Sequence, residues 1–505
     1  MSLATIFSRS ADGVMAPQVF VEAHLSNGLP SLSIVGLPET AVKESKDRVR
    51  GALLNSGFEF PPRRITINLA PADIPKEGGR FDLPIAIGIL AASGQVSAAD
   101  LHHYEFIAEL GLGGELRPVN GILSAALQAA GENRVLVVAA KNAQEAALVE
   151  EGKVLAPASL LELTACLNGQ QSLPETVLKS PGRVIKADHD LADVRGQHQA
   201  KRALEIAAAG NHSLLMSGPP GSGMTMLANR LPALLPEMSR DEALQTAAIY
   251  SIGNTGIDLD CWKQRPLRAP HHTASAVALV GGGSKPKPGE ISLAHNGILF
   301  LDELPEFGRH VLEVLREPME SGVISISRAN RQSEFPARFQ FLAAMNPCPC
   351  GYLGDASGRC VCTADQVQRY QARLSGPLLD RIDMQVEVLA VPMDLLAADH
   401  VPSESSDQVR ERVLASRHRQ LQRAGLLNSQ LTPRQLDHES GISDAARSSL
   451  ADALSRLRLS ARLFHRLLRV ARTIADLAGA DHVDSNHVAE AMRYRMLDRY
   501  LKKST

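Results

Sequence analysis

A glycine-rich segment near the middle of the 505-residue chain has the composition of a phosphate-binding loop. An apolar run at 214–216 precedes it and a helical pattern at 226–235 follows, which is the strand–loop–helix context of a nucleotide site. Its glycines let the backbone wrap around a triphosphate, so that N–H groups and a helix N-terminus face the anion. The Thr225 hydroxyl would bind Mg²⁺. The predicted nucleotide contacts of this phosphate loop are Gly218, Pro219, Pro220, Gly221, Ser222, Gly223, Met224, Thr225 and Met226.

The loop departs at one position from the pattern G-x-x-x-x-G-K-[ST], because Met224 stands where the pattern has lysine. Methionine has nearly the reach of lysine but carries neither a charge nor a hydrogen-bond donor. The backbone can still bind phosphate, whereas a charge-assisted hydrogen bond of roughly 1.5–3 kcal/mol is lost. We interpret Met224 as an inactivating, engineered substitution in a chain otherwise built to hydrolyse ATP. A natural pseudo-ATPase and a mere glycine turn are the alternatives.

Two carboxylates follow a second apolar run. Residues 297–301 predict a buried parallel strand, and Asp302 and Glu303 stand at its carboxyl end. Asp302 would hold the Mg²⁺ shell, and Glu303 would polarise the attacking water. Acidic pairs after strands are common, but a pair that follows a phosphate loop favours an ATPase.

Four further residues resemble nucleotide contacts of AAA+ ATPases. In that class a segment similar to 194–197, which ends here in Gln197, lies against the adenine. Asn346, after the strand predicted at 339–345, matches the polar sensor of the γ-phosphate. Arg381 resembles the finger that reaches a neighbouring subunit's nucleotide, and Arg462 resembles the second sensor on the lid. The alternatives are a turn asparagine at 346 and a surface charge at 462. Surface charges are expected of most arginines nearby, namely Arg456, Arg458, Arg466, Arg469 and Arg472.

Four of the six cysteines crowd into a C-x-C-x9-C-x-C pattern, Cys348, Cys350, Cys360 and Cys362. In a reducing compartment disulfides are disfavoured, and four clustered thiolates suit tetrahedral zinc. We therefore predict a structural Zn²⁺ in segment 348–362, with reduced spectator thiols as the alternative. The isolated Cys166 and Cys261 are expected to be packing residues.

Two basic insertions separate the chain from a plain ATPase. Lys285 and Lys287 lie among glycines, which suits a loop that projects into a channel and touches phosphates. Arg328 and Arg331 tip a predicted hairpin that resembles the pre-sensor hairpins of DNA-translocating AAA+ helicases. A solvated turn is the alternative for the hairpin. The adjacent histidines at 271–272 are expected only to pack or cap, without a metal.

The composition of the whole chain narrows its class. It has 53 basic and 55 acidic residues, so any DNA contact must be a local patch. Its first twelve residues lack the layout of a signal peptide, and no apolar run approaches a membrane span. We expect a cytoplasmic protein with no membrane partner. The expected fold is α/β, with an α+β domain at 1–170, a linker at 171–190, an ATPase core at 191–395 and an α-helical lid at 396–505.

The first domain carries motifs at 36–38, 68–73 and 79–84 that resemble the N-terminal domain of magnesium-chelatase-like proteins, itself similar to the proteolytic domain of Lon. Lon-type domains need a serine in a glycine-rich turn, but here Gly79 is followed by Arg80. Leu123 stands where the catalytic lysine belongs. Without nucleophile or base we reject protease function, and expect the fold to serve binding or oligomerisation.

Taken in order, these motifs identify the chain as a member of the ComM/YifB family of magnesium-chelatase-like AAA+ proteins. The resemblance implies a homohexameric ring that uses ATP and Mg²⁺ to move on single-stranded and branched DNA. Such a helicase drives branch migration and integrates incoming strands in natural transformation and homologous recombination. A protein-remodelling or metal-chelatase-type ATPase acting on a protein partner is the alternative, and a catalytically dead scaffold would follow if Met224 were natural.

Overall fold

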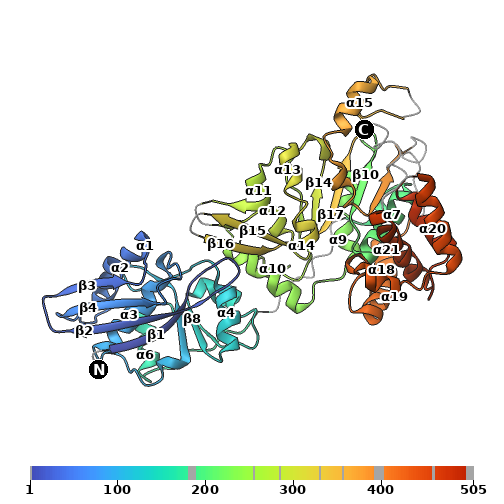
Figure 1. Ribbon diagram of the computed structural model, residues 1–505. Coiled ribbons are helices and arrows are strands. Elements are labelled where there is room, and N and C mark those ends of the chain that lie inside the picture. Colours follow the sequence, from blue (N-terminus) through green and yellow to red (C-terminus); the bar gives the residue numbers. More distant parts are fainter. Residues whose placement is uncertain are drawn as a thin grey trace.

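The computed structural model describes residues 3–179, 189–253, 256–283, 286–328, 331–354, 358–391, 403–457 and 461–495. Figure 1 shows a first sheet with its helices in blue, a second sheet in green to yellow, and a group of helices in orange to red. The fold is mixed α/β with a parallel sheet and a helical C-terminal region, as the sequence predicts.

Seven strands form the first sheet, in the order β3-β4-β2-β1-β5-β8-β9. The β1–β2 and β2–β4 pairs are antiparallel, and the other neighbours run parallel. The strands are β1 (Leu3–Arg9), β2 (Gln18–Ser26), β3 (Ser31–Val35), β4 (Arg64–Ala70), β5 (Tyr104–Ile107), β8 (Val135–Val138) and β9 (Val154–Leu155), with a small pair, β6 (Glu109–Leu110) and β7 (Leu116–Arg117). In β2 every second residue is buried, the alternation of a strand with one face on the core.

Six α-helices accompany this sheet in the described part of the unit. They are α1 (Thr40–Lys43), α2 (Ser45–Asn55), α3 (Asp82–Ala92), α4 (Ile122–Gly131), α5 (Ala143–Ala146) and α6 (Leu160–Leu167). Helix α3 is buried along its whole length, since it packs across β1 and β2. Leu123 is fully buried and Arg80 nearly so, and burial lowers the pKa of Arg80 to about 10. Both residues that replace the expected protease machinery therefore pack inside the unit.

The second sheet consists of five parallel strands in the order β11-β14-β17-β10-β18. Its strands are β11 (Leu267–Arg268), β14 (Ile298–Leu301), β17 (Gln340–Met345), β10 (Leu214–Ser217) and β18 (Met384–Glu387). Every residue of β10, β14 and β17 is buried, as expected of central parallel strands. Because these three are neighbours and parallel, their carboxyl ends meet at one edge, and the predicted site residues follow those ends.

Helices and two hairpins surround the second sheet. They are α7 (His198–Gly210), α8 (Met224–Ala228), α9 (Leu231–Leu234), α10 (Arg240–Ile252), α11 (Ala276–Val280), α12 (Glu290–Leu293), α13 (Arg309–Glu313), α14 (Pro318–Ser321), α15 (Ala364–Gln371) and α16 (Gly376–Leu379), with hairpins β12 (Gly281–Gly282)–β13 (Lys287–Pro288) and β15 (Val323–Arg328)–β16 (Arg331–Pro336). The helix expected after the phosphate loop is divided into α8 and α9. Pro232, in the first turn of α9, has no N–H to continue α8.

The first unit contacts the second at two places. Helix α4 packs beside α10, and the Gly121 N–H donates to the Ser251 carbonyl at 2.9 Å. The turn between β1 and β2 lies against the β15–β16 hairpin: a Cβ at Gly13 would lie 3.4 Å from the Glu334 carbonyl oxygen. Figure 1 shows this hairpin extending toward the blue unit.

His295 links the end of α12 to the strand β17. It is buried, and its Nδ1 accepts a hydrogen bond from the Arg338 N–H at 3.0 Å. Burial and the charge of Arg338 lower the pKa of His295 to about 4. An unfolded histidine has a pKa of about 6.5, so between about pH 6.5 and 4 the unfolded state binds more protons at this residue.

We therefore expect His295 to lower the stability of the protein as the pH falls from about 6.5 to 4, by up to about 3 kcal/mol. His295→Asn should flatten that part of the curve, because the asparagine Oδ1 can accept the same hydrogen bond without titrating. Urea unfolding across this range measures the slope. An unchanged slope in the variant would show that other groups cause it.

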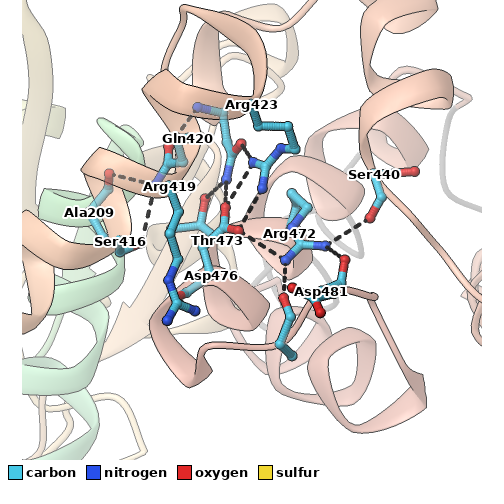
Figure 2. A network of polar contacts seen from close by, with 12 residues as sticks. Ala209, Ser416, Arg419, Gln420, Arg423, Ser440, Arg472, Thr473, Asp476 and Asp481 are labelled. Carbon is cyan, nitrogen blue, oxygen red and sulfur yellow. Dashed lines mark hydrogen bonds and ion pairs between the residues drawn. The ribbon is translucent and has the colours of Figure 1, made fainter.

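The C-terminal helices pack against α7 and α9, and they are α18 (Ser406–Ala424), α19 (Pro433–Glu439), α20 (Asp444–Leu457), α21 (Ala461–Ala478) and α22 (Ser485–Arg493). Asp484 caps α22 by accepting from the N–H groups of Asn486 and His487. Figure 2 shows the polar network at the centre of this group. Asp476 accepts from Arg423 at 2.7 and 2.9 Å, from Arg472 at 2.9 Å and from Asn428 at 2.8 Å.

This network corrects the expectation that most arginines of this region are surface charges. Arg472 is 1% exposed, and Arg466 and Arg469 are partly buried. The reason is that buried acceptors surround them: Arg472 also donates to the backbone carbonyls of Ser440 and Asp481. The side chains at 456 and 458 lie outside the described residues.

We expect Asp476→Ala to destabilise the protein by about 3–5 kcal/mol, because it leaves the buried Arg472 and the partly buried Arg423 without their carboxylate. Thermal unfolding measures the change. Asp437→Ala is the matched control: Asp437 is exposed and pairs only at 3.8 Å with Arg447, so the effect should be within about 1 kcal/mol. Equal effects of the two substitutions would contradict the prediction.

Candidate nucleotide site and the adjacent cysteine cluster

The phosphate loop is tightly packed at its base and open at its mouth. A Cβ at Gly218 would lie 2.2 Å from the Val388 carbonyl oxygen, so no side chain fits there. Gly221 and Gly223 have φ of +77° and +91°, and no atom lies within 4 Å of where their Cβ would be. Loop backbone that needs glycine yet faces open space fits a site where an anion approaches N–H groups.

The two predicted Mg²⁺ ligands meet at this mouth. The Thr225 hydroxyl donates to Asp302 Oδ2 at 2.6 Å, although 77 residues separate them. The Glu303 N–H donates to Asp302 Oδ1 at 2.9 Å, and Glu303 has a φ of +52°, unusual for a residue with a side chain. A hydroxyl and a carboxylate oxygen in contact form a donor set that fits Mg²⁺.

A histidine that the sequence analysis assigned only to packing or capping contacts the predicted catalytic carboxylate. His272 Nδ1 lies 3.1 Å from Glu303 Oε2. Its neighbour His271 contacts Thr273 Oγ1 at 2.9 Å, in keeping with that expectation. The role of His272 was not predictable, because no spacing pattern links it to a carboxylate on a different segment.

Gln197 holds the phosphate loop in place. It has a φ of +54°, and its Nε2 donates to the Ser222 carbonyl at 3.0 Å and to the Leu389 carbonyl at 2.6 Å. These bonds join the loop to the residues after β18. The predicted adenine contact at Gln197 stays a prediction.

The Met224 side chain is partly buried and packs against the apolar core between the sheet and the C-terminal helices. Met226 is 47% exposed, and Thr225 is exposed beside it. A methionine here therefore stabilises the base of α8 by apolar contact, and contributes no donor to a phosphate.

The predicted sensors and finger come from three different segments of the chain. Asn346 directly follows β17, at the same sheet edge as Asp302. Arg381 pairs with Glu320 at 2.6 Å and donates to the Pro377 carbonyl, and its side chain is 13% exposed. The backbone of residue 462 lies in the first turn of α21, and its side chain lies outside the described residues. The sensor and finger roles stay predictions.

A buried carboxylate joins the finger-bearing turn to the C-terminal helices. Asp383 accepts from Arg466 at 2.9 Å and lies 3.4 Å from His212 Nδ1. Burial alone would raise the pKa of Asp383, but its contact with His212 and the charge of Arg466 hold that pKa well below its usual value. Arg466 also donates to the Arg381 carbonyl at 2.6 Å, so α21 contacts the turn directly.

The four cysteines converge beside the loop, and we call them the cysteine cluster. Their sulfurs all lie within 4.8 Å of one another. The Cys348–Cys350, Cys348–Cys360 and Cys350–Cys360 sulfur distances are 3.4, 3.8 and 3.7 Å. A tetrahedral ion with metal–sulfur bonds of about 2.3 Å needs sulfurs about 3.8 Å apart. A hydrogen bond from the Tyr352 backbone lowers the pKa of Cys350 to about 6, whereas the pKa values of Cys360 and Cys362 are raised by burial and by the neighbouring thiols.

The basic residues predicted to contact DNA are only partly described. Lys287 is exposed in β13, and Lys285 lies outside the described residues. Arg328 and Arg331 face each other across the end of the β15–β16 hairpin, so the predicted hairpin is confirmed. Their side chains lie outside the described part, and their contact with DNA stays a prediction.

Comparison with known proteins assigns the family. Family models described as "Magnesium chelatase, subunit ChlI", "Subunit ChlI of Mg-chelatase" and "Magnesium chelatase, subunit ChlI C-terminal" match residues 190–396, 21–142 and 403–495. The chain is 52% identical to Competence protein ComM of Haemophilus influenzae, over all of this chain and 99% of ComM. It is 50% identical to YifB of Escherichia coli, over 99% of this chain and 98% of YifB. The chain belongs to the ComM/YifB family.

Membership of the ComM/YifB family agrees with the geometry of the site. The magnesium-chelatase-like AAA+ family indicates an ATPase that uses ATP and Mg²⁺, and in this chain Asp302 contacts Thr225 at the mouth of the phosphate loop. None of the helices in the described ranges combines the length and the apolar character that a membrane crossing requires.

Proposed function

We propose that this ComM/YifB-family protein is a ring-forming, ATP-dependent DNA motor that promotes strand integration in natural transformation and homologous recombination. The observation that carries the proposal is the 2.6 Å contact between Thr225 and Asp302 at the mouth of a phosphate loop. Two basic hairpins project from the same core, and a full-length relative bears the name of a competence protein. A homohexamer would form the channel for these hairpins.

Each residue at the site would have a separate role in ATP hydrolysis. Backbone N–H groups of the phosphate loop bind phosphate oxygens, and Thr225 and Asp302 hold Mg²⁺, which neutralises phosphate charge when bound. Glu303 orients and polarises the attacking water, and His272 orients Glu303. Arg381 would neutralise transition-state charge in a neighbouring subunit, which requires its release from Glu320.

Hydrolysis by this chain would be slow, because Met224 supplies no cation to the β- and γ-phosphates. Binding would depend on the backbone of the phosphate loop and on Thr225. We also propose that the cysteine cluster binds one Zn²⁺, since four sulfurs within 4.8 Å of one another, three of them 3.4–3.8 Å apart, match zinc better than spectator thiols.

DNA-stimulated ATP hydrolysis tests the proposed function. Met224→Lys protein is incubated with ATP and Mg²⁺, with and without forked or single-stranded DNA, and phosphate release is followed. Stimulation by DNA, and displacement of a strand from the fork, are expected. ATPase activity that ignores DNA but responds to a protein partner would favour the remodelling or chelatase-type alternative.

Replacing both Arg328 and Arg331 with alanine is expected to weaken binding to all DNA sequences alike. Affinity decreases with salt, and a plot of log affinity against log salt has a negative slope. For every phosphate that the double variant no longer neutralises, the magnitude of this slope should decrease by about 0.7 on single-stranded DNA. Fluorescence anisotropy at several salt concentrations measures the slope. Arg63→Ala with Arg64→Ala removes the same charge from exposed positions of the first unit and should leave the slope unchanged. Equal slopes in both double variants would place the hairpin outside the DNA channel.

A further inference from the structure

The segment that carries the cysteine cluster packs directly against the phosphate loop. Gly351 has a φ of +83°, and a Cβ there would lie 2.5 Å from Cδ and 2.6 Å from Cγ of Pro220. Both distances are shorter than any real Cβ contact, so only glycine allows this approach. The same Cβ would lie 3.7 Å from Asn346 Cγ. Gly351 therefore lies between the phosphate loop and the predicted sensor.

Residues of the cysteine cluster lie next to the contact between Gly351 and Pro220 in the chain. Cys350 directly precedes Gly351, and the Gly351 N–H donates to the Cys348 carbonyl at 2.9 Å. On the inner side, Cys348 is fully buried and Gln371 of α15 donates to the Pro347 carbonyl at 3.1 Å. The position of Gly351 thus depends on the backbone conformation of Cys348 and Cys350, whose sulfurs belong to the cluster.

In the described outer part of the segment, the Arg359 guanidinium lies 4.3 Å from the centre of the Tyr352 ring. Between the end of β17 and the start of α15, the described residues contain no helix or strand that could hold the backbone by a hydrogen-bond ladder. Val361, between the last two cysteines, is 84% exposed. Ordering such a segment costs about 1–2 kcal/mol per residue, and a metal ion bound by four of its side chains can offset that cost.

We propose that the metal in the cysteine cluster controls the nucleotide site. A thiophilic divalent ion of the zinc class, bound by all four thiolates, holds Gly351 against Pro220 and keeps the phosphate loop in its binding shape. Loss of the metal releases this contact and weakens nucleotide binding. By linkage, bound nucleotide must then tighten the affinity of the cluster for the metal by the same factor. This inference rests on the proposed zinc and nucleotide sites and adds a regulation to them.

The test compares zinc-loaded and zinc-depleted full-length protein, in the chain as it stands and in Met224→Lys. Depletion uses a chelator under reducing conditions, and metal analysis gives the zinc per chain. Titration with a fluorescent N-methylanthraniloyl-ADP is expected to show about tenfold weaker binding after depletion, and recovery when Zn²⁺ is returned. Cys360→Ser, which removes a ligand, should bind like the depleted protein and fail to recover.

Substitutions at two glycines distinguish the effect of the Gly351–Pro220 contact from the effect of metal binding. Gly351→Ala keeps all four cysteines but drives a methyl group into Pro220, so it should retain zinc and bind nucleotide about tenfold more weakly. Gly354→Ala is the matched control in the same segment. Its φ of +81° imposes a similar backbone strain, but no atom lies within 4 Å of its Cβ, so its nucleotide affinity should be unchanged.

Three results would overturn the inference, and each has a different meaning. Equal nucleotide affinity with and without zinc, or in Gly351→Ala and Gly354→Ala, would refute the coupling alone. Normal nucleotide binding in a freshly purified, reduced protein that holds no zinc would refute the metal site while the nucleotide site stands. No nucleotide binding by zinc-loaded Met224→Lys protein would refute the proposed function as well.

Discussion

Met224→Lys is expected to raise the rate of ATP hydrolysis by about 10²–10³-fold while nucleotide affinity rises only about tenfold. The rate should rise more than the affinity because the positive charge of lysine matters most in the transition state. In the bound ground state, backbone N–H groups of the loop would already contact the phosphates, and Thr225 would hold the Mg²⁺. During transfer, negative charge develops on the β- and γ-oxygens, and a cation at residue 224 would add to its stabilisation there.

The fold allows the substitution. Met224 packs partly against the apolar core, and a lysine can leave its methylene stem in that contact while its ammonium group extends to the mouth of the loop. Phosphate release and N-methylanthraniloyl-ADP titration separate the rate from the affinity. Met224→Leu is the matched uncharged control and should stay as slow as the unmodified chain. Brisk hydrolysis by the unmodified chain would show that another group supplies the charge.

Glu303→Gln, made in the Met224→Lys protein, is expected to reduce kcat by about 10²–10⁴-fold and leave nucleotide affinity nearly unchanged. Glutamine keeps the shape of the side chain and a contact with His272 at 3.1 Å, but it cannot accept a proton from water. Single-turnover hydrolysis measures the reduction. A large fall in affinity instead would place Glu303 among the nucleotide contacts.

Two further substitutions, a control and a test of His272, are compared with Glu303→Gln. Glu306→Gln changes a nearby exposed carboxylate that pairs with Arg373 at 2.9 Å, and it should leave kcat within about twofold. His272→Ala should lower kcat by about tenfold at unchanged affinity, because His272 only orients the carboxylate. If His272→Ala weakens nucleotide binding as strongly as it slows hydrolysis, the histidine acts on the loop and not through Glu303.

The local elements were largely predictable from the sequence, because their signals lie within a few residues. The strand β8, the helix α3, the cap at Asp484 and the β15–β16 hairpin each follow from periodicity or a capping residue. The strand β1 was missed, although it lies at the centre of the first sheet. Its alternation occupies only seven residues at the chain terminus, and the pairing with β2 and β5 gives it its place.

The sequence by itself determined the chemistry available to this protein: a glycine loop, an acidic pair, four clustered thiols and one missing lysine at 224. Only the tertiary structure decided which groups meet. Strand order brings Thr225 to Asp302, and packing places His272 on Glu303 and Gly351 on Pro220. Local patterns specify helices and strands, whereas contacts between separate segments depend on how those elements pack into one core.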